Sequence, residues 1–344
     1  MFESVLEAEA VGEAAQDRDR HRSAYRFILQ ARLLDEKLAG LYRAGKIHGG
    51  VFLSRGQEAL SVAIGLSLRK TDVFAPLIRD SAGRLAFGES IPEALQTCLG
   101  SAQGPMRGRD GNVHRGRPQE GYLPMISHLG AMISVVNGTL FARRFKGVTD
   151  MVGATCIGDG GTATGAFHEA LNQAAVEKLP LVLVVANNQF AYATANDREF
   201  ACRDLADRAV GYGVTPHSLD ATDLSACLQV VGGAVARARK GGGPQLVVAS
   251  LLRLCGHGEH DDAGYITPEL KASPLGRDCM KVAEDILLSR AYASADELTA
   301  WRNEAQRTIE TAVARVQREP APDPFTETWS AISCKQLRET HEAI

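Results

Sequence analysis

Apolar residues in the middle of the chain follow two alternating patterns, short continuous runs and longer stretches with helical spacing. The runs 151–157 and 181–186 are apolar, and glycines, a proline and asparagines bound them. Such runs are typical of strands buried on both faces of a parallel sheet. Further strands are predicted at 74–78, 214–218 and 245–250. Because helical stretches separate the strands, the pattern predicts an α/β fold, a doubly wound parallel sheet with helices on both faces.

The segments between these strands divide into predicted helices and two predicted loops. Apolar spacing and boundary residues predict helices over 56–68, 92–99, 131–145 and 164–176. Segment 100–124 is rich in glycine, arginine and proline, and segment 189–203 is polar. We expect both to be loops, and long loops inside compact domains are usually functional.

The two ends of the chain differ from this central pattern. Residues 1–18 are acidic and rich in alanine, which predicts a mobile or partner-contacting arm. Helical spacing over 20–42 predicts a packed amphipathic helix. After residue 268 the chain is mostly helical, with a short helix expected beyond the proline-rich segment 320–324. We therefore predict three parts: an acidic N-terminal arm 1–18, an α/β domain 19–267 and a helical C-terminal extension 268–344.

Composition narrows the classes of protein to which this fold can belong. The 344 residues carry a formal net charge of −3, and a sequence of this balance lacks the basic patch of a nucleic-acid-binding surface. The seven cysteines include no CxxC pair, which suits a reducing cytoplasm better than a disulfide framework or a zinc site. No apolar run is long enough to cross a membrane. We expect a soluble cytoplasmic protein without nucleic-acid or membrane partners.

The strongest chemical signal lies where the two central strands end. Gly158, Asp159, Gly160 and Gly161 follow the first strand, and Asn188 follows the second. Parallel strands lie about 4.8 Å apart, so Asp159 and Asn188 can converge on one ion at the edge where α/β sheets bind ligands. The glycines allow close backbone approach, and the next helix N-terminus favours phosphate. This arrangement predicts a divalent metal bound beside a diphosphate.

The same glycines also match a looser pattern, the dinucleotide fingerprint G-x-G-x-x-A, which runs from Gly158 to Ala163. A nicotinamide site requires an acidic residue at the end of the second strand to bond the ribose. Here Asn187 and Asn188 occupy that place, and amide oxygens suit magnesium beside one carboxylate and two phosphates. A GDG turn followed by an asparagine pair resembles the thiamine diphosphate motif.

Two further candidates follow other predicted strands. His257 lies after strand 245–250, in a segment with His260, Asp261 and Asp262. These side chains are also an alternative metal site, although their spacing matches no common zinc arrangement. Arg79 follows strand 74–78 and is able to bind a diphosphate through two hydrogen bonds; a lone arginine is more often a solvated surface charge.

The long loop and its flank offer weaker candidates. His114 and His128 are expected to face solvent, as loop histidines more often do, and Leu129 would ordinarily be a core residue. Four arginines of the loop predict a solvated basic segment, with contact to an anionic substrate as the alternative: Arg107, Arg109, Arg115 and Arg117.

Taken in order, these motifs resemble one family, the alpha subunit of the thiamine diphosphate-dependent first component of 2-oxo acid dehydrogenase complexes. Pyruvate, branched-chain 2-oxo acid and acetoin dehydrogenases are the types concerned. The resemblance covers about residues 20–329 and rests on these motifs: Gly56-Gln-Glu-Ala59, Arg79, Gly108-Arg-Asp-Gly-Asn-Val-His114, Ser127-His-Leu129, Gly158-Asp-Gly160, Asn187-Asn188 and Arg253-x-x-Gly-His257.

The resemblance implies a thiamine diphosphate-binding fold and a set of site residues. It implies that Mg²⁺ is held by the side chains of Asp159 and Asn188 and by the carbonyl of Phe190. It also implies a role in catalysis for His257. The cofactor-binding residues that it implies are Arg79 and His257 at the diphosphate, Ser127 and Leu129 at the ring system, and Gly158, Asp159, Gly160, Gly161 and Asn188 around the metal.

The activity implied is oxidative decarboxylation of a 2-oxo acid, with acyl transfer to a lipoyl group of an acyltransferase partner. In this family a separate beta subunit supplies the glutamate that activates the cofactor, so the resemblance implies an alpha-two beta-two heterotetramer. Two alternatives remain: a non-catalytic alpha-like subunit, and an acetoin dehydrogenase alpha subunit.

Two positions depart from the family pattern. Ile78 stands where the family usually has a tyrosine, whose hydroxyl bonds the diphosphate. We expect weaker cofactor binding unless Arg79, Ser81 or Arg84 supplies a substitute contact. Gly258 stands where kinase-regulated members carry a serine, so we expect that switch to be absent.

Overall fold

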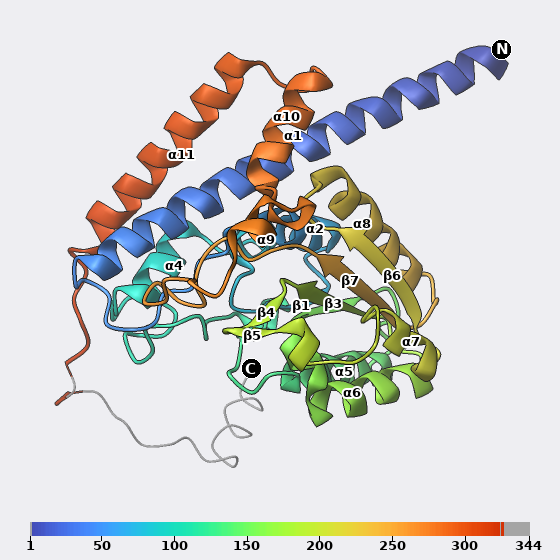
Figure 1. The fold of residues 1–344 in the computed structure, drawn as a ribbon, viewed down its shortest axis with the longest axis horizontal. Coiled ribbons are helices and arrows are strands. Elements are labelled where there is room, and N and C mark those ends of the chain that lie inside the picture. Colours follow the sequence, from blue (N-terminus) through green and yellow to red (C-terminus); the bar gives the residue numbers. More distant parts are fainter. Residues whose placement is uncertain (1, 324, 327–344) are drawn as a thin grey trace.

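The sheet forms the centre of the molecule, as the apolar runs predict (Figure 1). The computed structural model describes residues 2–323, 325 and 326. Five parallel strands lie in the order β1-β2-β3-β7-β6. Strand β7 is inserted between β3 and β6, so the chain order reverses at β7. In open α/β sheets ligands bind at the carboxyl ends of the strands, where the chain order reverses. The bounds are β1 (Val73–Ala75), β2 (Gly153–Gly158), β3 (Leu181–Asn187), β6 (Thr215–Asp220) and β7 (Gln245–Ser250).

Helices cover both faces of this sheet, which confirms the predicted α/β class (Figure 1). One face packs on α5 (Ala131–Phe145), α6 (Gly165–Val176) and α7 (Asp207–Tyr212). The other packs on α2 (Glu58–Ser67) and α8 (Leu224–Arg239). Successive residues of β3 enter opposite cores, Val184 on the α2 side and Val185 on the α5 side. Burial on both faces explains why the strands read as continuous apolar runs.

A helical layer from both ends of the chain packs on one side of this core (Figure 1). Helix α1 (Phe2–Arg43) contacts α10 (Cys279–Ser289) and α11 (Ala295–Val316). In these contacts the Tyr25 hydroxyl donates to Glu284 Oε1 at 2.6 Å, and Arg22 Nη2 donates to Glu297 Oε1 at 2.7 Å. Helix α1 starts well before the predicted residue 20. The three-part division stays a prediction, and the short helix expected after 320–324 lies outside the described residues.

The loops contain elements that the sequence pattern did not predict. The 189–203 segment includes a short hairpin, β4 (Phe190–Ala191) and β5 (Thr194–Ala195). Helix α3 (Ser81–Phe87) was also unexpected. The remaining elements are α4 (Ile91–Cys98), α9 (Pro268–Ala272) and the short 3₁₀ helices η1 (Pro118–Glu120), η2 (Gly160–Ala163), η3 (Asn196–Arg198) and η4 (Pro274–Gly276). Within the described part of the chain, no helix has the combined length and apolar character needed to cross a membrane.

Candidate functional site

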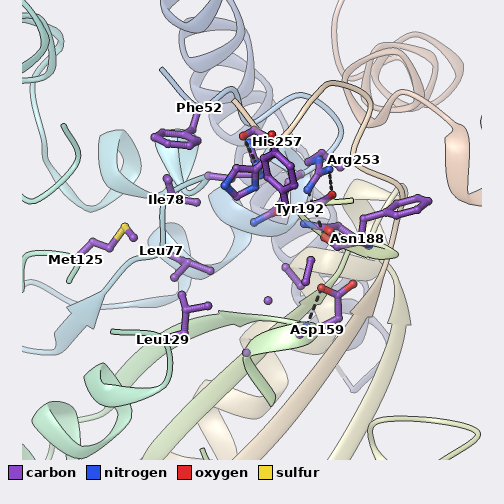
Figure 2. Close-up of a pocket in the computed structure, with 18 of the residues that line it drawn as sticks. Phe52, Leu77, Ile78, Met125, Leu129, Asp159, Asn188, Tyr192, Arg253 and His257 are labelled. Atoms are coloured by element: carbon purple, nitrogen blue, oxygen red, sulfur yellow. Dashed lines mark hydrogen bonds between the residues drawn. The ribbon is translucent and has the colours of Figure 1, made fainter. Parts of the chain in front are cut away.

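A pocket of about 460 Å³ lies at the carboxyl ends of β2, β3 and β7 (Figure 2). Every residue that the sequence singled out as a cofactor or metal contact lines it: Arg79, Ser127, Leu129, Gly158, Asp159, Gly160, Gly161, Asn188, Phe190 and His257. These residues come from loops far apart in sequence, so the fold brings them together. Their individual roles stay predictions.

The pocket has one apolar side and one polar side (Figure 2). The apolar side is formed by Phe52, Leu77, Ile78, Met125 and Leu129. The polar side is formed by Asp159, Asn188, Tyr192, Arg253 and His257. An elongated ligand with an apolar ring at one end and charge at the other matches this division.

Asp159 presents a carboxylate oxygen that lacks a partner. The residue follows β2 directly and is 2 % exposed. Its Oδ1 accepts a hydrogen bond from Gly160 N at 3.0 Å, whereas its Oδ2 is buried without a hydrogen-bond partner in the described structure. Burial raises the pKa of Asp159 to about 6. Because an unsatisfied buried carboxylate is costly, a cation at Oδ2 would stabilise the site.

Two further oxygens with suitable chemistry follow β3. Asn188 is 7 % exposed, and its Oδ1 accepts a weak hydrogen bond from Phe190 N at 3.4 Å. The carbonyl of Phe190 accepts one from Arg253 Nη1 at 3.3 Å. One carboxylate, one amide and one carbonyl are ligands that Mg²⁺ accepts when phosphate oxygens complete the shell. The residues therefore fit the predicted metal.

The alternative metal site in segment 257–262 finds no support. No group of three or more His, Cys, Asp or Glu side chains able to hold a metal occurs in the described part of the chain. Asp261 instead accepts hydrogen bonds from His257 N and the Tyr265 hydroxyl, each at 2.6 Å. These bonds fix the backbone of the loop that carries His257.

Close packing requires glycine at two positions of the turn after β2, Gly160 and Gly161. A Cβ at Gly160 would lie 2.5 Å from the Ala191 side chain, and one at Gly161 would lie 2.6 Å from that of Ile157. A Cβ at Gly158 would meet nothing within 4 Å, and this glycine lines the pocket. The turn therefore holds β2 and the hairpin together while leaving its backbone open to a ligand.

Two buried arginines make the polar side electropositive. Arg79 is 4 % exposed and Arg253 is 2 % exposed. Among the described residues, no carboxylate oxygen lies within 4.0 Å of either guanidinium. Their groups donate to backbone carbonyls instead, for example Arg79 Nη2 to His257 O at 2.6 Å and Arg253 Nη2 to Tyr192 O at 2.7 Å. Burial lowers the pKa of Arg79 to about 10, and an anionic ligand would supply the missing counter-charge.

The ring of His257 lies between two aromatic side chains. Its centroid is 5.4 Å from that of Phe52 and 4.7 Å from that of Tyr192, with edge-on geometry in both cases. Burial, together with the charges of Arg79 and Arg253, lowers the pKa of His257 to about 4. The imidazole is therefore neutral near pH 7.

We expect His257 to stay neutral down to about pH 4. Between pH 6.5 and this value the unfolded chain binds a proton that the folded chain does not, so His257 makes the fold less stable as the pH falls. Arg79→Met removes one positive charge and should raise the pKa of His257, whereas the remote Arg69→Met should not. Ring ¹⁵N chemical shifts, assigned with His257→Gln, measure both; titration at the ordinary value in wild type would contradict the prediction.

The long loop contains features that the sequence analysis assigned wrongly. His114 lines the pocket rather than facing solvent; its Nδ1 pairs with Asp110 Oδ2 at 2.8 Å and its Nε2 with Ser127 Oγ at 3.1 Å. Arg115 is buried and forms two hydrogen bonds with Glu89, at 2.5 and 2.9 Å. This buried pair anchors the loop and is not part of a solvated basic surface.

Sequence reasoning also passed over residues that belong to the site. Arg253 entered only as part of a motif, although its position after a predicted strand was a usable signal. Leu129 would ordinarily be a core residue, and only the family resemblance assigned it to the cofactor; it is 48 % exposed on the pocket wall. Tyr192 and Phe52 carried no signal, because only the folded loops bring them to His257.

Comparison with known proteins places this geometry in a family. Residues 25–325 match the model of the family described as "Dehydrogenase E1 component". The chain is 31 % identical to the alpha subunit of acetoin:2,6-dichlorophenolindophenol oxidoreductase from Cupriavidus necator, over 90 % of this chain and 92 % of that protein. It is 30 % identical to the alpha subunit of the pyruvate dehydrogenase E1 component from Rhizobium meliloti, over 87 % and 86 %.

A third relative has a different name. The alpha subunit of 2-oxoisovalerate dehydrogenase from Bacillus subtilis is 32 % identical, over 84 % of this chain and 90 % of that protein. The three names differ in substrate but share the alpha subunit designation. The chain therefore belongs to the dehydrogenase E1 component family and is similar to its alpha subunits.

Proposed function

We propose that the chain is the alpha subunit of a 2-oxo acid dehydrogenase that binds thiamine diphosphate with Mg²⁺. The observation that carries the proposal is that the polar side of the pocket contains both buried cations and a buried carboxylate oxygen without partners. Arg79 and Arg253 are buried cations without a carboxylate partner, and Asp159 Oδ2 is a buried acceptor without a donor. A metal diphosphate satisfies both, because it brings anionic oxygens to the arginines and a cation to the carboxylate.

Within this proposal each residue has a task. Asp159, Asn188 and the Phe190 carbonyl hold Mg²⁺, and Arg79 with the open turn at Gly158 receives the diphosphate. When bound, thiamine diphosphate supplies the electron sink that decarboxylation requires. Ser127 and Leu129 face the ring end, and neutral His257 is able to donate or accept a hydrogen bond near the reacting groups. The reaction proposed is oxidative decarboxylation of a 2-oxo acid with acyl transfer to a lipoyl group.

The pocket of the single chain also lacks a component. Of the described residues that line it, Asp159 is the sole carboxylate, and the proposal commits Asp159 to the metal. Ser127, Leu129 and Tyr192 remain exposed on its wall. A beta subunit that covers this opening and supplies the activating glutamate fits both facts, in an alpha-two beta-two assembly that acts with a lipoyl acyltransferase in the cytoplasm.

Each of two alternative functions is favoured by one observation. The name of the Cupriavidus necator relative favours acetoin as the substrate. Ile78, which brings no hydroxyl to the pocket, favours a non-catalytic alpha-like subunit. Retention of the carboxylate, amide and carbonyl oxygens at the metal position argues against loss of function.

The proposal is tested by calorimetric titration of the purified chain, alone and with its beta partner, with thiamine diphosphate. We expect saturable binding that requires Mg²⁺, and much weaker binding of thiamine, which has no phosphate. NADH is the comparison for a nicotinamide site. Binding of NADH, or failure of thiamine diphosphate to bind under either condition, would overturn the proposal.

A further inference from the structure

The turn of the β4–β5 hairpin carries a tyrosine into the pocket. The hairpin pairs Phe190 with Ala195 and Ala191 with Thr194, and Tyr192 is the first residue of the turn. Tyr192 has a φ of 54°, a conformation that non-glycine residues rarely adopt. Strained positions of this kind persist where the surroundings hold them, and they cluster at ligand sites.

Arg253 holds this turn in place. Its Nη2 donates to Tyr192 O at 2.7 Å, and its Nη1 donates to Phe190 O at 3.3 Å. One buried guanidinium therefore fixes both the predicted metal-binding carbonyl and the turn that carries Tyr192. The Tyr192 ring lies edge-on to His257, with 4.7 Å between the ring centroids (Figure 2). The side chain is thus positioned on the polar side of the pocket.

The hydroxyl of Tyr192 has no hydrogen-bond partner in the described structure, and the residue is 49 % exposed while lining the pocket. Other tyrosines use their hydroxyls in hydrogen bonds within the protein: Tyr25, Tyr122, Tyr212, Tyr265 and Tyr292. Nothing in the described structure therefore requires the oxygen of Tyr192, which leaves it free to donate to a ligand.

The opposite side of the pocket lacks such a donor. Ile78 precedes Arg79 and lines the apolar side. Besides Arg79, Ser81 and Arg84 were expected as substitutes for the missing hydroxyl, but neither lines the pocket. Ser81 Oγ donates to Asp35 Oδ1 at 3.3 Å, and Arg84 Nη1 donates to the Tyr122 hydroxyl at 2.8 Å. A hydroxyl that replaces the missing one must therefore come from another part of the pocket wall. Tyr192 is linked to this region through His257, whose backbone O accepts from Arg79.

We infer that the Tyr192 hydroxyl donates a hydrogen bond to a phosphate oxygen of the diphosphate ligand and so replaces the hydroxyl that Ile78 does not bring. The inference rests on the proposed function. A phenol is a donor of suitable length for an anionic oxygen, and bonds to charged acceptors are about twice as strong as neutral ones. Tyr192 is thus a diphosphate-binding residue of this site.

Tyr192→Phe tests the inference, because it keeps the ring contact with His257 and removes only the hydroxyl. Full-length chain, alone and with its beta partner, is titrated with thiamine diphosphate and with inorganic pyrophosphate, each with Mg²⁺. We expect the dissociation constant to rise roughly tenfold or more for both ligands. The matched control is Tyr212→Phe, whose hydroxyl contacts His168 outside the pocket, and it should leave both constants unchanged.

Thermal unfolding separates binding from structure. Without ligand, Tyr192→Phe should unfold at the wild-type temperature, because the hydroxyl has no partner to lose. Wild-type affinity in Tyr192→Phe would overturn the inference while leaving the proposed function intact. If wild type binds neither diphosphate, the proposed function fails, and the inference fails with it.

A double-mutant cycle with Ile78→Tyr tests the replacement itself. If Tyr192 compensates for the missing hydroxyl, Ile78→Tyr should tighten binding of thiamine diphosphate more in the Tyr192→Phe chain than in wild type. Equal effects in the two backgrounds would show that the hydroxyls act independently and would overturn the idea of replacement.

Discussion

Asp159→Ala is expected to abolish Mg²⁺-dependent binding of thiamine diphosphate and to leave the fold intact. The side chain is buried with one oxygen unsatisfied, and its other oxygen accepts a single local hydrogen bond from Gly160 N. Its removal therefore costs the free protein little. Mutation of residues that only hydrogen-bond to a metal ligand already lowers metal affinity by about 10–100-fold. Loss of the charged ligand itself should therefore weaken binding of the metal and cofactor by at least about 100-fold.

Calorimetry with and without Mg²⁺ measures this effect, and circular dichroism with thermal unfolding checks the fold. Asn188→Ala should act in the same direction, because it removes the amide ligand. Asp197→Ala is the matched control, since it removes an exposed carboxylate of the same segment that lies outside the pocket lining. Normal affinity in purified Asp159→Ala would contradict the metal assignment.

The elements that the sequence predicted best are those decided by local pattern. Strand β7 (Gln245–Ser250) and helix α5 (Ala131–Phe145) have the predicted bounds. A Gly-Gly-Gly-Pro turn precedes β7, and Gly130 and Gly147 lie on either side of α5. Strand β1 ends at Ala75, earlier than predicted, because Pro76 has no N–H to continue the ladder. Local chemistry therefore accounts for this error as well.

The sequence pattern did not predict helix α3, because packing against another helix rather than local propensity stabilises it. Gly83 lies in its middle, where glycine weakens a helix. A Cβ at Gly83 would lie 2.5 Å from Ser61 O, and one at Gly65 would lie 2.4 Å from Gly83 O. The two glycines let α2 and α3 pack at very short range, and this packing compensates for poor local propensity. The sequence pattern alone contains no sign of it.

The same distinction applies to the site. Asp159 and Asn188 follow buried strands, so the rule that parallel strands share an edge predicts their approach. Tyr192 and His114 depend on tertiary contacts instead. Tyr192 reaches the pocket because Arg253 holds its turn, and His114 does so in a loop anchored by the buried pair of Arg115 and Glu89. Residues of this kind can be assigned to the site only from the folded structure.

The second large effect concerns catalysis: the chain alone is expected to decarboxylate no 2-oxo acid. Activation of the cofactor requires a carboxylate, and the described pocket wall offers only Asp159, which the proposal assigns to the metal. Pyruvate, a branched-chain 2-oxo acid and acetoin are assayed with 2,6-dichlorophenolindophenol as the electron acceptor. We expect no turnover from the chain alone and cofactor-dependent turnover of one substrate after addition of the beta partner.

Glu199 makes this test sharper, because it is a carboxylate of the described chain that bonds the pocket residue Ala191. Its Oε1 accepts a hydrogen bond from Ala191 N at 3.0 Å, and its Oε2 is buried without a partner in the described structure. Burial and the neighbouring Asp159 raise its pKa to about 7. Steady cofactor-dependent turnover by the chain alone would refute the shared site, and loss of that turnover in Glu199→Gln would identify Glu199 as the activating group. Turnover that requires the beta partner and survives Glu199→Gln places the activating carboxylate on the partner.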